Sequence, residues 1–125
     1  MLEDVEGIVI SEQDFKESSK IINVLTKEHG IIGIMAKGAK GIKSPLRSST
    51  TKLSYGTFTI YFKGDKLSLL KEVSIKDNFI NIIKDIELIS FATYLVELAK
   101  QVYKESENIN VYDILISGLK KINTS

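Results

Sequence analysis

The spacing of apolar residues changes once along this chain, near residue 77, and the change divides the sequence into two kinds of structure. Before it, apolar and polar residues alternate over short segments rich in Val, Ile and Thr, which is typical of β-strands. After it, apolar residues recur every three or four positions, which is typical of helices. The sequence therefore predicts an α+β protein with a strand-rich domain at residues 1–76 and a helical segment at residues 77–125.

Five segments of the first part have the pattern of strands. The fourth shows it most clearly, because Phe58 and Phe62 fall on one face while Thr59 and Tyr61 fall on the other. Gly64-Asp65 then predicts a tight hairpin turn into the fifth. The predicted strands are Val5–Ser11, Ile21–Thr26, Ile31–Ala36, Leu53–Phe62 and Leu67–Ile75.

The order of these strands predicts a small barrel. Gly7 and Gly33 lie inside strand patterns, where a missing side chain indicates a bulge or sharp bend of the kind that barrel closure requires. Residues 37–51 are polar and too long for a hairpin turn, and Ser44 followed by Pro45 is typical of a helix start. Five strands with a short helix between the third and fourth predict an OB-fold barrel, with an SH3-like barrel as the alternative.

The second part predicts helices that are too apolar to stand alone. Ile86–Tyr103 confines its polar residues to one narrow stripe, so most of its circumference must be covered. A short helix, Phe79–Ile83, precedes it, and Val111–Ile122 follows with Asn110 as its N-cap. We expect either that the chain holds the first part of a longer, here incomplete, helical domain or that it oligomerises through these helices. The alternative is that the barrel covers more of this helix surface.

Charge is unevenly distributed. Residues 1–76 hold 12 Lys/Arg and 9 Asp/Glu, whereas residues 77–125 hold 5 and 7, and no acidic residue occurs from His29 to Gly64. A basic block in a chain of net charge +1 predicts contact with a polyanion. A solvated loop with a chance excess of charge is the alternative.

The residue inventory argues against catalysis. The chain has no Cys, which excludes a disulfide framework, a thiolate metal site and a Cys nucleophile. His29, the only histidine, falls in a predicted turn, and Lys37–Gly41 lacks the spacing of a phosphate-binding P-loop. The acidic residues match no metal-binding spacing. We expect a protein that is not an enzyme, with no cofactor and no metal. With no long apolar run and no signal segment, we also expect it to be cytoplasmic.

With catalysis argued against, binding is the function class that remains. An OB barrel that holds single strands combines a cationic groove with aromatic faces on which bases stack. Tyr61 is the main stacking candidate and Tyr55 and Phe15 are further ones, with packing against the helices as the alternative for each. We expect binding that is independent of base sequence and sensitive to salt. The predicted DNA-binding residues are Lys37, Lys40, Lys43, Arg47, Lys52, Lys63 and Tyr61.

Several segments, in order, carry a family resemblance. Phe15–Ser18 is an aromatic-x-Glu-Ser segment, Thr26–Gly30 reads TKEHG, and Ala36–Lys40 (AKGAK) leads to Ser44 and Arg47. The later segments SYGTFTIYFKG and FATYLVELAKQVY continue the same order. Together they cover nearly the whole chain, which resembles the RecO family of bacterial DNA repair proteins. Lys52-Leu53 departs from the Gln-Pro of many members, which affects the shape of the loop.

The resemblance implies more than the residues alone do. It implies an N-terminal OB barrel, a helical domain of which this chain would hold only the first part, and often a Cys-rich zinc site beyond it. It implies a non-enzymatic recombination mediator that binds single- and double-stranded DNA, promotes annealing and, with RecR, helps RecA displace the single-strand-binding protein SSB. The barrel would bind DNA and RecR, and the later helical region would bind SSB. The alternative is a barrel that mainly docks RecR.

Overall fold

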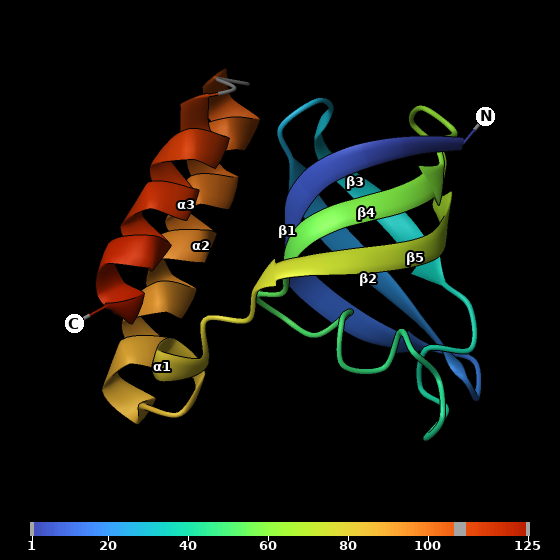
Figure 1. The fold of residues 1–125 in the computed structure, drawn as a ribbon. Coiled ribbons are helices and arrows are strands. Elements are labelled where there is room, and N and C mark those ends of the chain that lie inside the picture. Colours follow the sequence, from blue (N-terminus) through green and yellow to red (C-terminus); the bar gives the residue numbers. More distant parts are fainter. Residues whose placement is uncertain (1, 107–109, 125) are drawn as a thin grey trace. The chain divides into compact units, whose positions relative to one another are not determined.

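The computed structural model describes residues 2–106 and 110–124, and the chain divides into two compact units. The first unit, residues 1–78, is a β-barrel. The second unit, residues 79–125, is helical over its described residues (Figure 1). The fold is therefore α+β, as the change of hydrophobic period predicts.

Five strands close the barrel. They are β1 (Leu2–Phe15), β2 (Ser19–Thr26), β3 (Gly30–Ala36), β4 (Tyr55–Tyr61) and β5 (Ser68–Asp77). Their order around the barrel is β1-β2-β3-β5-β4, and β4 pairs with β1 to close it. The β3–β5 pairing is parallel, whereas the other pairings are antiparallel. This is the strand order of an OB-fold, so the predicted barrel is confirmed.

The barrel interior is apolar and its wall is tightly curved. Val5, Phe58 and Ile60 are fully buried in the core, which is where the alternation places the last two. Gly7 pairs with Gly56 where β1 passes from its β4 partner to its β2 partner. A β-carbon at either position would overlap atoms of the neighbouring strand. The sequence predicts a bulge or sharp bend at Gly7, whereas the structure has a close approach of strands there and a register shift of β1 between Val9 and Ser11.

The expected short helix between the third and fourth strands is wrong. Residues 37–54 form consecutive turns in its place. The hydroxyl of Ser49 donates to the carbonyl of Pro45 (3.4 Å) and that of Thr50 to the carbonyl of Leu46 (2.7 Å). These carbonyls are the ones that a growing helix would offer to backbone N–H groups four residues later, so the side chains compete with the helix.

Three helices make up the described part of the second unit: α1 (Ile80–Ile83), α2 (Ile86–Ser106) and α3 (Asn110–Asn123). Asp85 caps α2, because its carboxylate accepts from the N–H groups of Glu87 (2.9 Å) and Leu88 (3.2 Å). An apolar cavity of about 270 Å³ lies between α2 and α3. In the described part of the chain, no helix is long and apolar enough to cross a membrane.

Candidate nucleic-acid interface

Residues 37–54, called here the basic loop, join β3 to β4 and are fastened to the barrel at both ends. Ala39 and Leu53 are buried. The N–H of Lys40 donates to the carbonyl of Ser18 (2.9 Å), and that of Leu53 donates to the carbonyl of Val9 (2.8 Å). The loop therefore has a defined path, and it presents the cations between these anchors from a fixed base.

Three predicted phosphate-binding residues of this loop are exposed. Lys37 stands directly after β3, Lys43 lies at the middle of the turns, and Arg47 follows it. Among the residues that the structure describes, no ion pair involves any of the three. The Arg47 guanidinium donates through Nη1 to the carbonyl of Lys40 at 3.3 Å. These three positive charges are therefore open to an anion from solvent.

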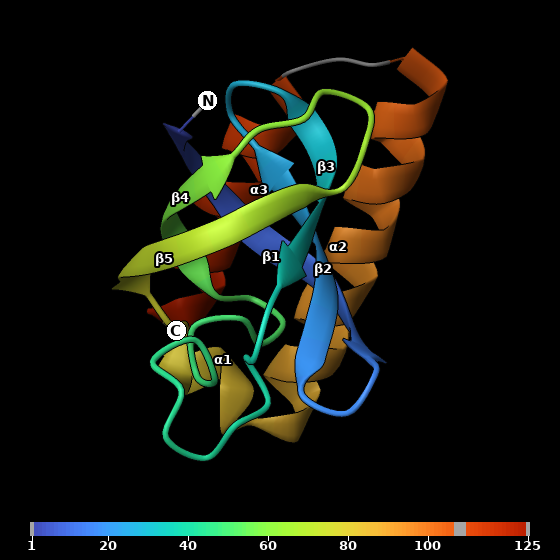
Figure 2. The same cartoon turned by 90° about the vertical axis from the view of Figure 1, so that its right-hand side faces the viewer.

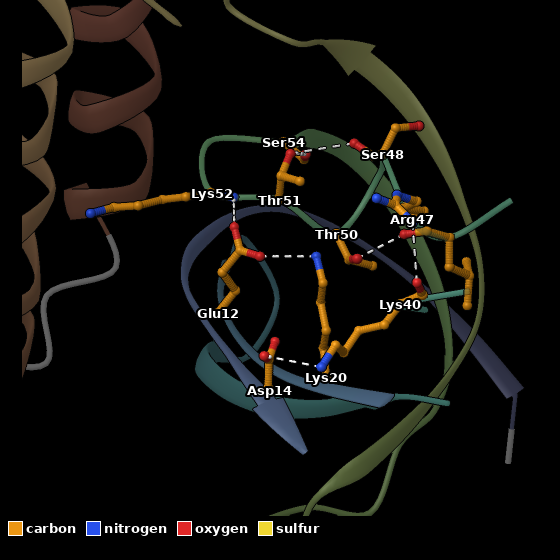
Figure 3. Close-up of polar contacts among 11 residues, drawn as sticks. Glu12, Asp14, Lys20, Lys40, Arg47, Ser48, Thr50, Thr51, Lys52 and Ser54 are labelled. Atoms are coloured by element: carbon orange, nitrogen blue, oxygen red, sulfur yellow. Dashed lines mark hydrogen bonds and ion pairs between the residues drawn. The ribbon is translucent and has the colours of Figure 1, made fainter. Parts of the chain in front are cut away.

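Two lysines beside the loop, Lys20 and Lys40, pair with carboxylates of β1, and the sequence did not predict these pairs. Lys40 Nζ lies 3.0 Å from Asp14 Oδ2, and Lys20 Nζ lies 2.9 Å from Glu12 Oε1. The second oxygen of Glu12 accepts from the backbone N–H of Lys52 at 2.8 Å (Figure 3). One sequence signal for these acids exists. Two carboxylates two residues apart share one side of a strand, next to a turn that leads back to Lys20.

A cavity of about 300 Å³ opens where these groups meet. It is several times the volume that one water molecule occupies, about 30 Å³. Its lining combines three cationic side chains, one carboxylate and one threonine, namely Lys20, Lys40, Arg47, Asp14 and Thr51. A cavity with this lining suits a small, singly charged oxyanion group.

Lys52 and Lys63 lie apart from this cavity. The Lys52 side chain points away from Glu12, although its backbone N–H donates to that residue. Lys63 is exposed in the β4–β5 turn, where its N–H donates to the hydroxyl of Ser68 at 3.1 Å. Figure 2 shows this turn at the top of the barrel and the basic loop at the bottom. The predicted cations thus occupy two separate regions.

Tyr61 belongs to a row of apolar side chains on the outside of the barrel. Directly paired residues of neighbouring strands point to the same face of a sheet. Here the pairing runs from strand to strand as Ile21–Met35, Met35–Leu69, Leu69–Tyr61 and Tyr61–Leu2. Tyr61 is 40% exposed and Leu2 44%, and the other three are half-buried. We call these five residues the apolar row. It adjoins the basic loop, since Lys37 follows Met35 by two residues.

Tyr55 does not serve as an exposed stacking face. It is buried, and its hydroxyl donates to Glu6 at 3.4 Å. Lys76 lies 5.8 Å from the centre of the Tyr55 ring and donates to the same carboxylate at 2.6 Å. This hydrogen bond to Glu6 raises the pKa of Lys76 above its ordinary value. Phe15, the third aromatic candidate, is half-buried at the end of β1.

The contacts of His29 are structural. It lies in the β2–β3 turn, where its Nε2 is 2.5 Å from Glu3 and its ring stacks on Phe62 at 4.0 Å between centroids. Within residues 2–106 and 110–124, no group of three or more His, Cys, Asp or Glu is arranged to hold a metal ion.

A closed five-stranded barrel of this strand order is an oligonucleotide/oligosaccharide-binding fold. The model of one family, described as recombination protein O N terminal, matches residues 1–79, and the chain belongs to this family. It is a family of DNA repair and recombination proteins.

Relatives from several bacteria are similar over nearly the whole chain. The DNA repair protein RecO of Clostridium perfringens is 40% identical over 119 residues, which is 94% of this chain and 48% of that protein. Those of Listeria welshimeri and Bacillus pumilus are 37% and 35% identical, over 97% and 98% of this chain and 48% of each protein. The chain spans about half the length of these relatives.

Proposed function

We propose that this chain is the DNA-binding part of a recombination mediator. It binds single- and double-stranded DNA and promotes annealing, and together with RecR it loads RecA on single strands coated by SSB. It acts by binding and not by catalysis, in the cytoplasm at the nucleoid, where its DNA substrate lies. The SSB contact is assigned to the later helical region of the family. The observation that carries the proposal is the anchored, cation-rich loop on the OB barrel of a RecO-family chain.

The proposed contacts are to phosphates, with little reading of bases. All but one of the cations are lysines, which act as point charges on flexible stems and do not form the bidentate pairs of arginine. The loop therefore follows a backbone of any sequence. On single strands the logarithm of the binding constant should fall by about 0.7 per phosphate contact for each unit of log salt concentration. With roughly five contacts the slope is about −3.5.

Salt titration of a labelled oligo(dT), followed by fluorescence anisotropy, tests this proposal. Replacing Lys37, Lys40 and Lys43 together by Gln should flatten the slope by about 2, because up to three contacts are lost. The matched control replaces three exposed lysines outside the loop by Gln, namely Lys27, Lys84 and Lys104. The proposal is wrong if the wild-type chain does not bind DNA at low salt, or if both triple variants give the wild-type slope.

A second candidate function is docking of RecR, and the apolar row favours it. Five aligned apolar side chains on the outside of a barrel are more than isolated exposed residues, and such surfaces mark sites of protein contact. We propose Tyr61 and Leu2, the most exposed pair, as the centre of this contact. Replacing both by Ser should abolish co-sedimentation with RecR and leave the affinity for duplex DNA unchanged. Retained RecR binding would remove the row from the interface.

A further inference from the structure

We propose that the cavity lined by Asp14, Lys40 and Arg47 binds a single DNA phosphate, and that the carboxylate of Asp14 occupies the phosphate's place until DNA displaces it. The inference rests on the proposed DNA binding and adds to it a named phosphate site and an internal competitor. It predicts that Lys40 changes its anionic partner when DNA binds.

Two of the three cationic residues that line this site, Lys40 and Arg47, are anchored by hydrogen bonds that involve backbone atoms. The N–H of Lys40 donates to the carbonyl of Ser18, and the carbonyl of Lys40 accepts from the guanidinium of Arg47. Lys40 thus ties the basic loop to the β1–β2 turn through its N–H and holds the guanidinium of Arg47 through its carbonyl. A phosphate that enters the cavity meets both charges without any movement of the loop.

The two carboxylates of β1 differ in how firmly they are held. Glu12 accepts from both the ammonium of Lys20 and the backbone N–H of Lys52, and its side chain is 33% exposed. Asp14 makes an ion pair with Lys40 only, as far as the described residues show, and its side chain is 70% exposed. Glu12 is therefore part of the loop's structure, whereas Asp14 can rotate into solvent at little cost.

The exchange conserves charge in the cavity. A carboxylate and a phosphodiester each carry one negative charge, and both accept hydrogen bonds through oxygen from an ammonium or guanidinium group. Exposed carboxylate–lysine pairs of this kind are weak. The competition should therefore lower DNA affinity by a small factor, about 1.4- to 5-fold, which follows from the usual strength of such pairs.

Two variants and one control test the site by salt titration with oligo(dT). Asp14→Asn should raise the affinity about 1.4- to 5-fold with an unchanged salt slope, because Lys40 already contacts a phosphate in the wild-type complex. Adding Lys40→Gln to that variant should reduce the slope by about 0.7, the value of one contact. Asp4→Asn is the control, since it removes the same charge from the same strand and keeps the oxygen that accepts from Thr59.

Each of the following results would overturn the proposal. If Asp14→Asn changes affinity no more than Asp4→Asn does, Asp14 does not compete. If Asp14→Asn alone steepens the slope by about 0.7, Asp14 keeps Lys40 in the wild-type complex and is not displaced. If the double variant keeps the slope of Asp14→Asn, Lys40 makes no phosphate contact. Absence of DNA binding by every variant and by the wild type at low salt would overturn the proposed function as well, so the two failures are distinguishable.

Discussion

Replacing Gly56 by Ala tests whether the barrel closes through an unusually close approach of β4 and β5. A β-carbon at this position would lie 2.2 Å from the carbonyl oxygen of Ser74 and 2.9 Å from the Cα of Ile75. Both are backbone atoms of the neighbouring strand, so no side-chain rotation relieves the overlap. The register of the two strands also shifts between Tyr55 and Gly56, which indicates a bulge at this point.

The expected cost is large for a domain of this size. Overpacking a tight site costs about 1–3 kcal/mol, and an overlap with backbone atoms places this variant at the upper end, about 3 kcal/mol. The barrel unit of 78 residues should have a free energy of unfolding of about 4–12 kcal/mol. Since each kcal/mol shifts Tm by about 4–8 °C in a domain this small, we expect Tm to fall by about 12–24 °C.

Thermal unfolding followed by far-ultraviolet circular dichroism measures this shift. Gly33→Ala is the matched control, because its β-carbon would meet Cδ1 of Leu67 at 3.1 Å and Oδ1 of Asn23 at 3.6 Å, both of which are side-chain and not backbone atoms. We expect that control to melt within a few degrees of the wild type. A Gly56→Ala variant that melts together with Gly33→Ala would refute the close approach of the two strands.

Three further variants test other contacts. Tyr61→Ala should weaken oligo(dT) binding roughly 5- to 150-fold if one base stacks on it, and should leave duplex DNA binding unchanged because the bases of a duplex stack on one another; an unchanged anisotropy titration with oligo(dT) would exclude stacking there. Glu12→Gln leaves the buried ammonium of Lys20 without its carboxylate, so urea denaturation should show a loss of about 1–3 kcal/mol. Asn123→Ala removes the acceptor for the N–H of Asn81, and hydrogen exchange of that amide should accelerate while the barrel amides keep their rates.

The barrel could be predicted from the sequence because buried and exposed side chains alternate along its strands. Phe58 is fully buried and Tyr61 is 40% exposed, as strict alternation along β4 requires. The same alternation placed Tyr55 on the outer face of the barrel, but it could not show that the Tyr55 side chain is buried on that face. The residues that interact with it, Glu6 and Lys76, are 49 and 21 positions away in the sequence. The helix expected at Ser44 failed for a different reason, since a cap signal does not reveal whether later hydroxyl groups compete for the carbonyls.

The charge of the candidate site shows most clearly what a local count misses. From the sequence the basic loop has five cations and no acid, namely Lys37, Lys40, Lys43, Arg47 and Lys52. The fold adds Lys20 and the carboxylates of Glu12 and Asp14, so six positive and two negative charges give +4.

The salt slope and the affinity of DNA binding depend on these charges in different ways. The salt slope depends on how many phosphates the protein contacts, because it reports the cations released from DNA. The affinity also depends on the intramolecular pairs that must be broken first. Asp14 therefore lowers the affinity for DNA without changing the salt slope. A titration analysed for its slope alone would support the charge count taken from the sequence. It would miss the competitor that the fold places beside Lys40.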